Sequence, residues 1–325
     1  MKILFYFLLK KKHISLVDGK MVAMEEFKKR VVVLMSTYNG EKYLEEQLRS
    51  LEEQVGVDLY VFVRDDGSTD NTIAILDAWS KKGFLSWYKG GNLRSAKSFM
   101  DALRNAPDAE YYAFCDQDDV WMPDKLLRAV NALENCSGEY KVYLSPAILA
   151  DSDMNVIGEM PLNYKFTVGE AIVTNPATGC TMLFNRELKK LVENKTPQVI
   201  KMHDEWLYKL CLFMNGVIYA DTESRIYYRQ HGNNVVGAKE SFMDGVVRRM
   251  KTLFMQGGSR SATLCEMHRL YNDIIPCENV HVLDKVKDYS LSFAGRLRLL
   301  GVKGLSAPNK FTMFNFYFAV ITGKF

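Results

Sequence analysis

The first half of the chain alternates short apolar runs with segments in which apolar residues recur at helical spacing. The runs at 31–35, 59–63, 84–88 and 111–115 are each of strand length. Runs that are mostly apolar are typical of strands buried on both faces of a sheet. The pattern therefore predicts four buried strands.

Helices are predicted between these strands. Their apolar positions are Leu44, Leu48 and Leu51, then Ile73, Leu76 and Trp79, then Phe99 and Leu103. Alternation of strand and helix is typical of an α/β fold with a mainly parallel sheet, right-handed crossovers and helices on both faces. We expect a Rossmann-like sheet flanked by helices.

Polar clusters follow three of the predicted strands directly, at 36–40, 65–70 and 116–119. Ligands of open parallel sheets bind outside the carboxyl ends of the strands, so we expect these clusters to meet at one edge of the sheet. This convergence is the main functional prediction of the pattern.

The third cluster, Asp116-Gln117-Asp118-Asp119, contains three carboxylates. Like charges this close repel and raise one another's pKa, so a cation is the simplest partner. A hard divalent ion binds carboxylate oxygens well and can in turn hold a diphosphate. The alternative is that Asp119 or Asp124 only caps the helix that follows.

The absence of two phosphate-binding motifs and the composition of the chain disfavour several classes of protein. No G-x-G-x-x-G or G-x-x-x-x-G-K-[ST] loop follows the first strand, which disfavours dinucleotide oxidoreductases and P-loop NTPases. A net charge of +3 is too small to indicate nucleic-acid binding, and 325 residues with 48% hydrophobic content suit a sizeable core. The six cysteines have no zinc-binding spacing, so we expect them to be reduced in the cytosol.

Residues 1–29 are expected to form an N-terminal extension. The apolar run at 3–9 is too short to span a bilayer, and the lysines at 10–12 follow it without a small-residue cleavage site. A signal peptide is therefore not expected. A membrane-touching arm and an upstream extension both stay open.

Three motifs resemble the nucleotide-sugar half of the family 2 glycosyltransferases, which are inverting enzymes of the GT-A fold. The motifs are Ser36-Thr37-Tyr38-Asn39, Asp65-Asp66-Gly67-Ser68-Thr69-Asp70 and Cys115-Asp116-Gln117-Asp118-Asp119-Val120-Trp121. The resemblance covers residues 30–237 and implies a GT-A domain over 30–240. The Asp-Gln-Asp-Asp-Val-Trp variant resembles the rhamnosyltransferase-like branch, which typically uses dTDP-L-rhamnose.

The resemblance implies a donor nucleotide site at the ends of the first two strands. Ser36 and Thr37 would contact the pyrimidine or the ribose, and Asp66 would accept a hydrogen bond from N3–H of the base. Asp65 would support that loop, although this segment is also good turn and helix-cap chemistry. Arg94 would reach the nucleotide or the diphosphate, or else lie solvated at the surface.

The resemblance also implies a metal site on Asp118, with Mn²⁺ or Mg²⁺ as the ion. Asp116 would be its ribose-facing or metal-facing partner, and Asp119 would be a supporting ligand or a helix cap. Arg229 and His231, in a glycine-containing segment, would touch the diphosphate or complete the metal shell.

The second half of the chain would supply the base and the acceptor side. Asp204 matches the family's Glu-Asp or His-Asp motif and would be the catalytic base, with Glu205 as the fallback and Trp206 beside it. Helix capping explains one acidic residue here equally well. The segment 178–185 is predicted to be a strand opened by Gly179, which either lines the donor sugar pocket or belongs to the core.

Residues 241–325 are expected to form a basic, helical C-terminal region. Basic residues outnumber acidic ones by about two to one, and the segment 311–325 is rich in aromatic residues. Two interpretations stay open. The region is either a set of amphipathic helices that rest on an anionic membrane or a helical cap packed on the catalytic domain.

The sequence thus predicts a metal-dependent inverting glycosyltransferase. It would move a sugar from a nucleoside-diphosphate donor to a saccharide or lipid-linked saccharide, in bacterial surface polysaccharide synthesis on the cytoplasmic face of the membrane. Two rivals remain. A sugar-phosphate nucleotidyltransferase normally has a glycine-rich basic loop where this chain has 36–40, and a non-catalytic nucleotide-sugar-binding protein would tolerate loss of Asp204.

Overall fold

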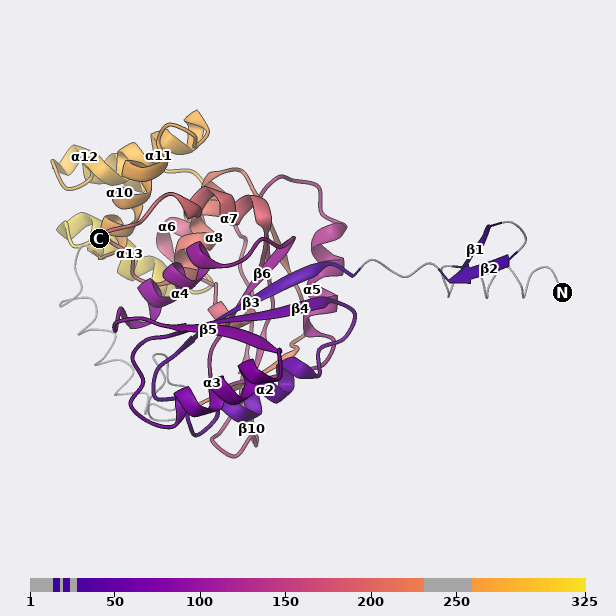
Figure 1. Cartoon of the computed structure of the whole chain (residues 1–325). Helices are drawn as coiled ribbons and strands as arrows, with labels where there is room; N and C mark the ends of the chain where they lie inside the picture. The colour runs from indigo at the N-terminus through magenta and orange to yellow at the C-terminus, as the bar shows by residue number, and fades with distance from the viewer. Residues whose placement is uncertain (1–13, 18–19, 24–27, 231–258) are drawn as a thin grey trace.

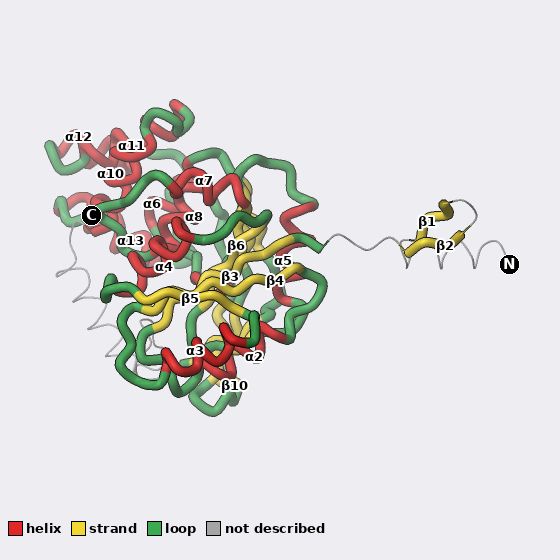
Figure 2. The backbone as a smooth tube through the Cα atoms, in the orientation of Figure 1, coloured by secondary structure: helices red, strands yellow, loops and turns green. Residues whose placement is uncertain are grey.

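The structure is a computed structural model that describes residues 14–17, 20–23, 28–230 and 259–325. Helices cover both faces of a central seven-stranded sheet, with strand order β12-β8-β11-β6-β3-β4-β5 (Figures 1 and 2). Its strands are β3 (Arg30–Thr37), β4 (Asp58–Asp65), β5 (Leu85–Lys89), β6 (Tyr111–Cys115), β8 (Lys141–Leu144), β11 (Leu183–Asn185) and β12 (Val217–Ala220).

The sheet is mainly parallel, as the alternation of strands and helices predicts. β5, β4, β3 and β6 pair in parallel, and so do β8 and β12. β11 is antiparallel to both of its neighbours, β6 and β8. The segment predicted as one strand over 178–185 begins instead with a short 3₁₀ helix, η1 (Gly179–Thr181), before β11.

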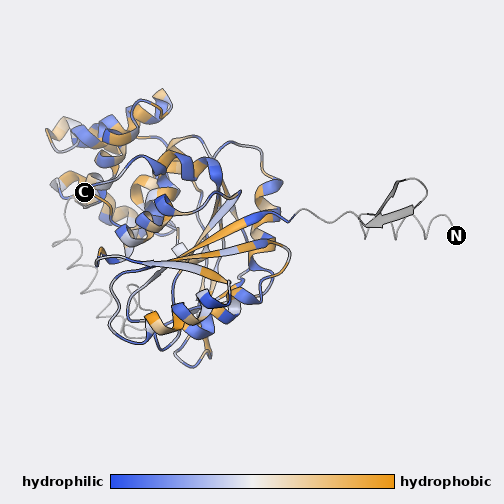
Figure 3. Cartoon of the chain, in the orientation of Figure 1, coloured by the Kyte–Doolittle hydropathy of each residue, from blue (hydrophilic) through white to orange (hydrophobic). Residues whose placement is uncertain are grey.

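Both faces of the central strands are buried, which explains their continuous apolar sequence. Along β3, Val32 and Leu34 lie in one hydrophobic cluster, whereas Val31, Val33 and Met35 lie in the other. The reason is that successive side chains of a strand point to opposite faces. β3 and β4 are correspondingly coloured as hydrophobic in Figure 3.

Each face of the sheet has its own helices. The side with the second cluster carries α2 (Leu44–Glu52), α3 (Thr72–Lys81) and α5 (Lys125–Glu134). The side with the first cluster carries α4 (Arg94–Asn105), α6 (Val168–Val173), α7 (Arg186–Glu193) and α8 (His203–Phe213). Every residue of α8 is buried, so this helix lies at the centre of the layer.

Two smaller sheets were not predicted. One contains β10 (Val156–Met160), β9 (Ala147–Ala150), β13 (Ile226–Arg229) and β7 (Val120–Trp121), in that order. β7 follows the acidic cluster directly and pairs with β13, so the 116–119 loop is anchored by a strand at each end. The other is an antiparallel pair, β1 (Ile14–Val17) and β2 (Lys20–Ala23).

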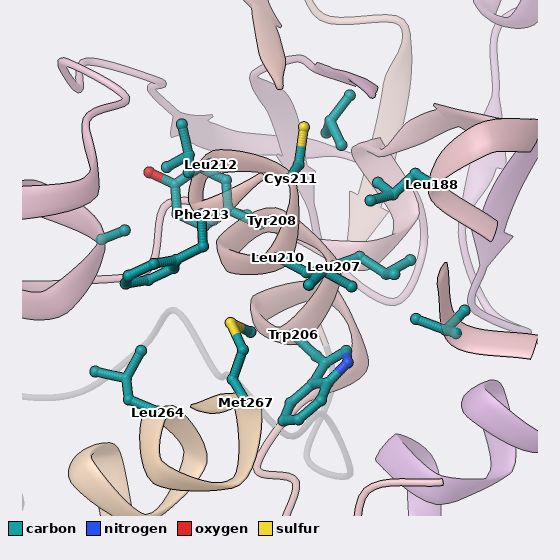
Figure 4. Packing of buried hydrophobic residues seen from close by; sticks show 14 of the residues in the cluster. Leu188, Trp206, Leu207, Tyr208, Leu210, Cys211, Leu212, Phe213, Leu264 and Met267 are labelled. Atoms are coloured by element: carbon teal, nitrogen blue, oxygen red, sulfur yellow. The ribbon is translucent and has the colours of Figure 1, made fainter. Parts of the chain in front are cut away.

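The C-terminal helices continue the core of the α/β domain. They are α10 (Ser259–Tyr271), α11 (Cys277–Asp288), α12 (Phe293–Leu300) and α13 (Lys310–Thr322). Leu264 and Met267 of α10 lie in the same hydrophobic cluster as Trp206 of α8 (Figure 4). The described part of this region is therefore a helical cap, and the predicted boundary at 240 lies outside the described residues. Among the described helices, none combines the length and the hydropathy needed to cross a bilayer.

Candidate active site

A pocket of about 780 Å³ lies at the carboxyl edge of the central sheet. Ser36, Asp66, Asp116 and Asp118 line it, and they come from all three polar clusters. Asp204 lines the same pocket from the start of α8. The convergence predicted from the strand ends is therefore confirmed.

Asp66 is held in one orientation at the pocket wall, where it is only 3% exposed. Its Oδ1 accepts the backbone N–H of Leu93 at 2.8 Å, and its Oδ2 accepts that of Arg94 at 2.9 Å. The buried guanidinium of Arg64 pairs with Oδ1 and also with Asp101 at 2.9 Å. Arg94 itself lines the pocket in a left-handed conformation, with φ of 63°. A second lone pair of Asp66 Oδ2 is left for a ligand donor.

Thr37 and Asp65 lie behind the pocket wall. The Thr37 hydroxyl is fully buried and donates to Asp65 Oδ1 at 3.1 Å. Asp65 Oδ2 accepts the backbone N–H groups of Gly67 and Ser68 at 3.0 and 2.9 Å. Asp65 thus supports the loop. The Thr37 side chain faces Asp65 and does not line the pocket, so a contact between Thr37 and the nucleotide stays a prediction. Ser36 remains at the pocket.

The three carboxyl groups of the acidic cluster have different environments. Asp116 and Asp118 line the pocket, and Asp119 is fully buried, with Oδ1 accepting the backbone N–H of Arg229 at 3.1 Å. Burial, together with the charges of Asp118 and Asp204, raises the pKa of Asp116 to about 7. Burial, together with the charges of Asp118 and Asp116, raises the pKa of Asp119 well above its usual value. Such shifts are expected where a cation belongs.

The donor set at this position fits a hard divalent ion. Oxygens of Asp116 and Asp119 and the Cys180 sulfur lie within 4.8 Å of one another. Burial and the nearby carboxylates raise the pKa of the Cys180 thiol, so it stays protonated and is a poor ligand. The carboxylates of Asp116 and Asp118 offer the oxygens that Mn²⁺ and Mg²⁺ prefer. His231, the other predicted ligand, lies outside the described residues.

Asp204 sits in the first turn of α8 and is 5% exposed. Its two oxygens accept the backbone N–H groups of Gly179 at 2.9 Å and Glu205 at 2.6 Å. Burial raises the pKa of Asp204 to about 7, although these hydrogen bonds oppose the shift. Gly179 is required for the close approach, because a Cβ there would lie 2.6 Å from His203 Nε2.

Glu205 and Trp206 do not line the pocket, unlike Asp204, so a place for them on the acceptor side stays a prediction that this pocket does not support. Glu205 forms a buried ion pair with Lys209 at 2.6 Å. Trp206 is fully buried, and its ring lies 6.2 Å from that of Tyr271 in α10. Consecutive residues of a helix point in directions about 100° apart, so Glu205 and Trp206 face other sides of α8 than Asp204 does.

Arg229 also differs from its prediction. Its guanidinium is buried behind the acidic loop, where Nε donates to the carbonyl oxygen of Asp118 at 2.7 Å. It also donates to the Ser152 carbonyl at 2.5 Å, pairs with Glu46 and stacks over the Tyr43 ring at 4.4 Å. Arg229 therefore holds the loop that carries Asp118 and does not line the pocket.

The sequence analysis missed several pocket residues. His203 is 3% exposed, stacks on Phe99 with ring centroids 4.1 Å apart, and is neutral because burial lowers its pKa to about 3. Tyr164 and Tyr228 line the pocket without any sequence signal. Arg64, which pairs with Asp66 and does not itself line the pocket, did have a signal, since a charged residue directly between the apolar run 59–63 and Asp65 is unusual for a buried strand.

Comparisons with known proteins show the family and the fold. The family model described as glycosyl transferase family 2 matches residues 32–190. The dTDP-rhamnosyl transferase RfbG of Shigella flexneri is 32% identical over 224 residues, which are 64% of this chain and 75% of that protein. The putative teichuronic acid biosynthesis glycosyltransferase TuaG of Bacillus subtilis is 25% identical, over 66% of this chain and 85% of that protein.

Two solved structures share the fold at lower identity. TarS of S. aureus in complex with UDP-GlcNAc superposes with a TM-score of 0.55 and 20% identity, over 85% of this chain and 76% of that one. The mannosyltransferase PcManGT from Pyrobaculum calidifontis, in complex with GDP-Man and Mn²⁺, gives a TM-score of 0.52 and 20% identity, over 99% and 92%. The chain belongs to glycosyltransferase family 2 and has the GT-A fold.

Proposed function

We propose that this protein is a metal-dependent, inverting glycosyltransferase that uses a nucleoside-diphosphate sugar. The observation that carries the proposal is that Asp66, Asp116, Asp118 and Asp204 line one pocket although they come from separate segments. The pocket volume of about 780 Å³ lies within the range of small-molecule sites.

The donor would lie along the strand ends. The oriented carboxylate of Asp66 suits an N–H donor of a pyrimidine, and the Ser36 hydroxyl is placed for the nucleoside. Asp116 and Asp118 would hold Mn²⁺ or Mg²⁺. Such an ion supplies positive charge that stabilises a leaving diphosphate.

Asp204 would be the general base. Its carboxylate accepts the proton of the acceptor hydroxyl, whose oxygen then bonds to C1 of the sugar. The bond between C1 and the diphosphate oxygen breaks, and the nucleoside diphosphate leaves with the electron pair, so the configuration at C1 is inverted. A pKa near 7 keeps a substantial fraction of Asp204 unprotonated at neutral pH.

We further propose dTDP-L-rhamnose as the donor and a lipid-linked saccharide as the acceptor, at the cytoplasmic face of a bacterial membrane. The similarity to RfbG, named as a dTDP-rhamnosyl transferase, supports the donor. The similarity to TuaG, named for teichuronic acid biosynthesis, supports a role in surface polysaccharide synthesis.

A donor screen with the full chain tests the function. We expect dTDP-L-rhamnose with Mn²⁺ or Mg²⁺ to raise the melting temperature more than UDP-GlcNAc or GDP-mannose does, because ligands that bind only the folded state stabilise it. Chelation with EDTA and the Asp118→Asn substitution should each reduce transfer by about 100-fold or more. Asp124→Asn, an acidic residue outside the pocket, is the matched control.

Each rival has its own signature. Release of pyrophosphate from dTTP and a sugar phosphate would show a nucleotidyltransferase. Donor binding without turnover over a panel of acceptors would show a binding protein. Transfer that survives both EDTA and Asp118→Asn would refute the metal-dependent assignment.

A further inference from the structure

Helix α13 is apolar on all sides, yet only one side of it is buried. Phe316, Ala319 and Val320 face the core. The opposite side is exposed, with Phe314 at 64% and Ile321 at 46%. A helix that is hydrophobic all round is normally buried on all sides, so something is expected to cover the exposed side.

Helix α12 extends this exposed surface. Phe293 and Leu297 are 61% and 52% exposed, and Arg296 of the same helix donates to the Ile321 carbonyl oxygen at 2.7 Å. We define the outer apolar face as the exposed apolar residues of α12, α13 and the turn before α12. They are Leu291, Phe293, Leu297, Phe311, Phe314, Tyr317, Phe318 and Ile321.

The charges within the segment that carries this face have a single sign, although the exposed Asp288 directly precedes it. Residues 289–325 contain no aspartate or glutamate, and their basic residues are Arg296, Arg298, Lys303, Lys310 and Lys324. Exposed aromatic residues combined with lysine and arginine are typical of helices that lie in the interface of an anionic membrane. Lysine and arginine near such a surface are attracted by the anionic lipid head groups.

Contacts link this region to the pocket. Ser306, in the segment between α12 and α13, approaches Glu170 Oε1 at 3.4 Å. The other oxygen of Glu170 accepts the backbone N–H of Lys165 at 2.6 Å. Lys165 follows Tyr164, which lines the pocket. The α12–α13 segment therefore packs directly behind one wall of the site.

We propose that the outer apolar face docks on an anionic phospholipid bilayer, with α13 lying in the plane of the interface. A second copy of this chain would cover the apolar residues, but its own basic residues would then face those of the first copy, which is unfavourable. The proposal rests on the proposed function in one respect, namely that docking would bring a lipid-linked acceptor to the pocket.

Vesicle co-sedimentation of the full chain tests the docking. We expect binding to phosphatidylglycerol-containing vesicles and about tenfold weaker binding to pure phosphatidylcholine vesicles. The double variant Phe314→Ser/Phe318→Ser should lose about tenfold in binding to the anionic vesicles. Val156→Ser on β10, where Val156 is 61% exposed, is the matched control and should bind like the parent chain.

The readouts separate docking from catalysis. Thermal stabilisation by a nucleotide sugar should be the same in the double variant and in the parent chain, because neither phenylalanine lines the pocket. A parent chain that stays in the supernatant with anionic vesicles would overturn the proposal. A dimer in sedimentation velocity that the double variant loses would overturn it too, in favour of self-association. If no nucleotide sugar stabilised the parent chain against heat, this result would count against the proposed function alone and not against docking.

Discussion

Helix α8 lies between two regions that treat buried charge differently. At its first turn, Asp204 faces the pocket, and burial raises the pKa of both Asp204 and Asp116 to about 7. The next residue, Glu205, points to another side of the helix, where it is paired with Lys209 at 2.6 Å. Burial and the charges of Asp118 and Asp204 are what raise the pKa of Asp116.

If Asp204 is the general base, as proposed above, one side of α8 serves function and the other serves stability. A buried carboxylate without a cation favours its neutral form and costs the folded protein free energy. In a buried ion pair, the attraction between the two charges offsets the cost of removing them from water. Removing one partner leaves the other charge buried and uncompensated, which destabilises the protein. Substitutions on the two sides should therefore have opposite consequences.

The largest effects should come from the adjacent residues Asp204 and Glu205. Asp204→Asn should lower kcat by about 10³-fold, because it removes the general base. It should leave the free energy of unfolding unchanged or higher. Glu205→Gln should lower the free energy of unfolding by about 3 kcal/mol or more, because Lys209 is left buried without its partner. Transfer assays and urea titrations measure the two.

A double variant controls this comparison. Glu205→Gln combined with Lys209→Met should recover much of the lost stability, since no uncompensated charge remains buried. If Glu205→Gln abolished transfer in folded protein while Asp204→Asn did not, the base would be Glu205 and the contrast between the two sides would be reversed.

The next effect concerns the contact between α8 and the C-terminal helices. Met267→Ala should lower the free energy of unfolding by about 2–4 kcal/mol, because the Met267 side chain is fully buried against α8. Phe314→Ser on the outer apolar face should change it by less than about 0.5 kcal/mol. Equal losses in urea titrations would show that the outer apolar face is also part of the core.

The residues at the pocket edge could be predicted from the sequence because their position depends only on where each strand ends. Strand ends of a parallel sheet meet at one edge, so Asp66 and Asp116 could be placed without any tertiary contact. Side-chain direction along α8 was not predictable in the same way. Whether Glu205 or Asp204 faces the pocket depends on which side of α8 packs against α10, and Tyr271 of α10 lies far along the chain.

Arg229 illustrates the same limit. Its segment suggested a phosphate contact, but its partners Glu46 and Asp118 lie 183 and 111 residues away in sequence. β13, which positions Arg229, belongs to the small sheet that the apolar pattern did not predict. Short strands such as β7 and β13 carry too few residues for their period to be recognised.

Removal of the Arg229 guanidinium should have an intermediate effect. Arg229→Met should lower the free energy of unfolding by about 2 kcal/mol, because the carbonyl oxygens of Asp118 and Ser152 lose a buried donor. We also expect a higher Mn²⁺ requirement for transfer, since the Asp118 loop is less fixed. Glu46→Gln is the control and should cost less than about 1 kcal/mol, because Glu46 is 51% exposed. An unchanged Mn²⁺ titration for Arg229→Met would mean that the loop is positioned without this residue.

The smallest effect is that the free energy of unfolding depends on pH with opposite sign in the two regions. The pKa of Asp204 is raised to about 7. Its contribution to the free energy of unfolding is therefore fully present below the unfolded pKa near 4 and is lost as pH rises through 7. Glu266 of α10 has a pKa lowered to about 2, chiefly by its hydrogen bond with Arg269. Its contribution is present above the unfolded pKa near 4.5 and is lost as pH falls toward 2.

Urea titrations in EDTA from pH 3 to 8 separate these two groups. Between pH 5 and 8 the parent chain should lose stability, and Asp204→Asn should reduce that loss by an amount on the order of 1 kcal/mol. Glu266→Gln should leave this window unchanged and should flatten the profile between pH 5 and 3. If Asp204→Asn left the alkaline slope intact, Asp116 alone would account for it, because burial and acidic neighbours raise its pKa to the same value. The unfavourable buried charge would still lie in the pocket, but it would belong to Asp116 and not to Asp204 of α8.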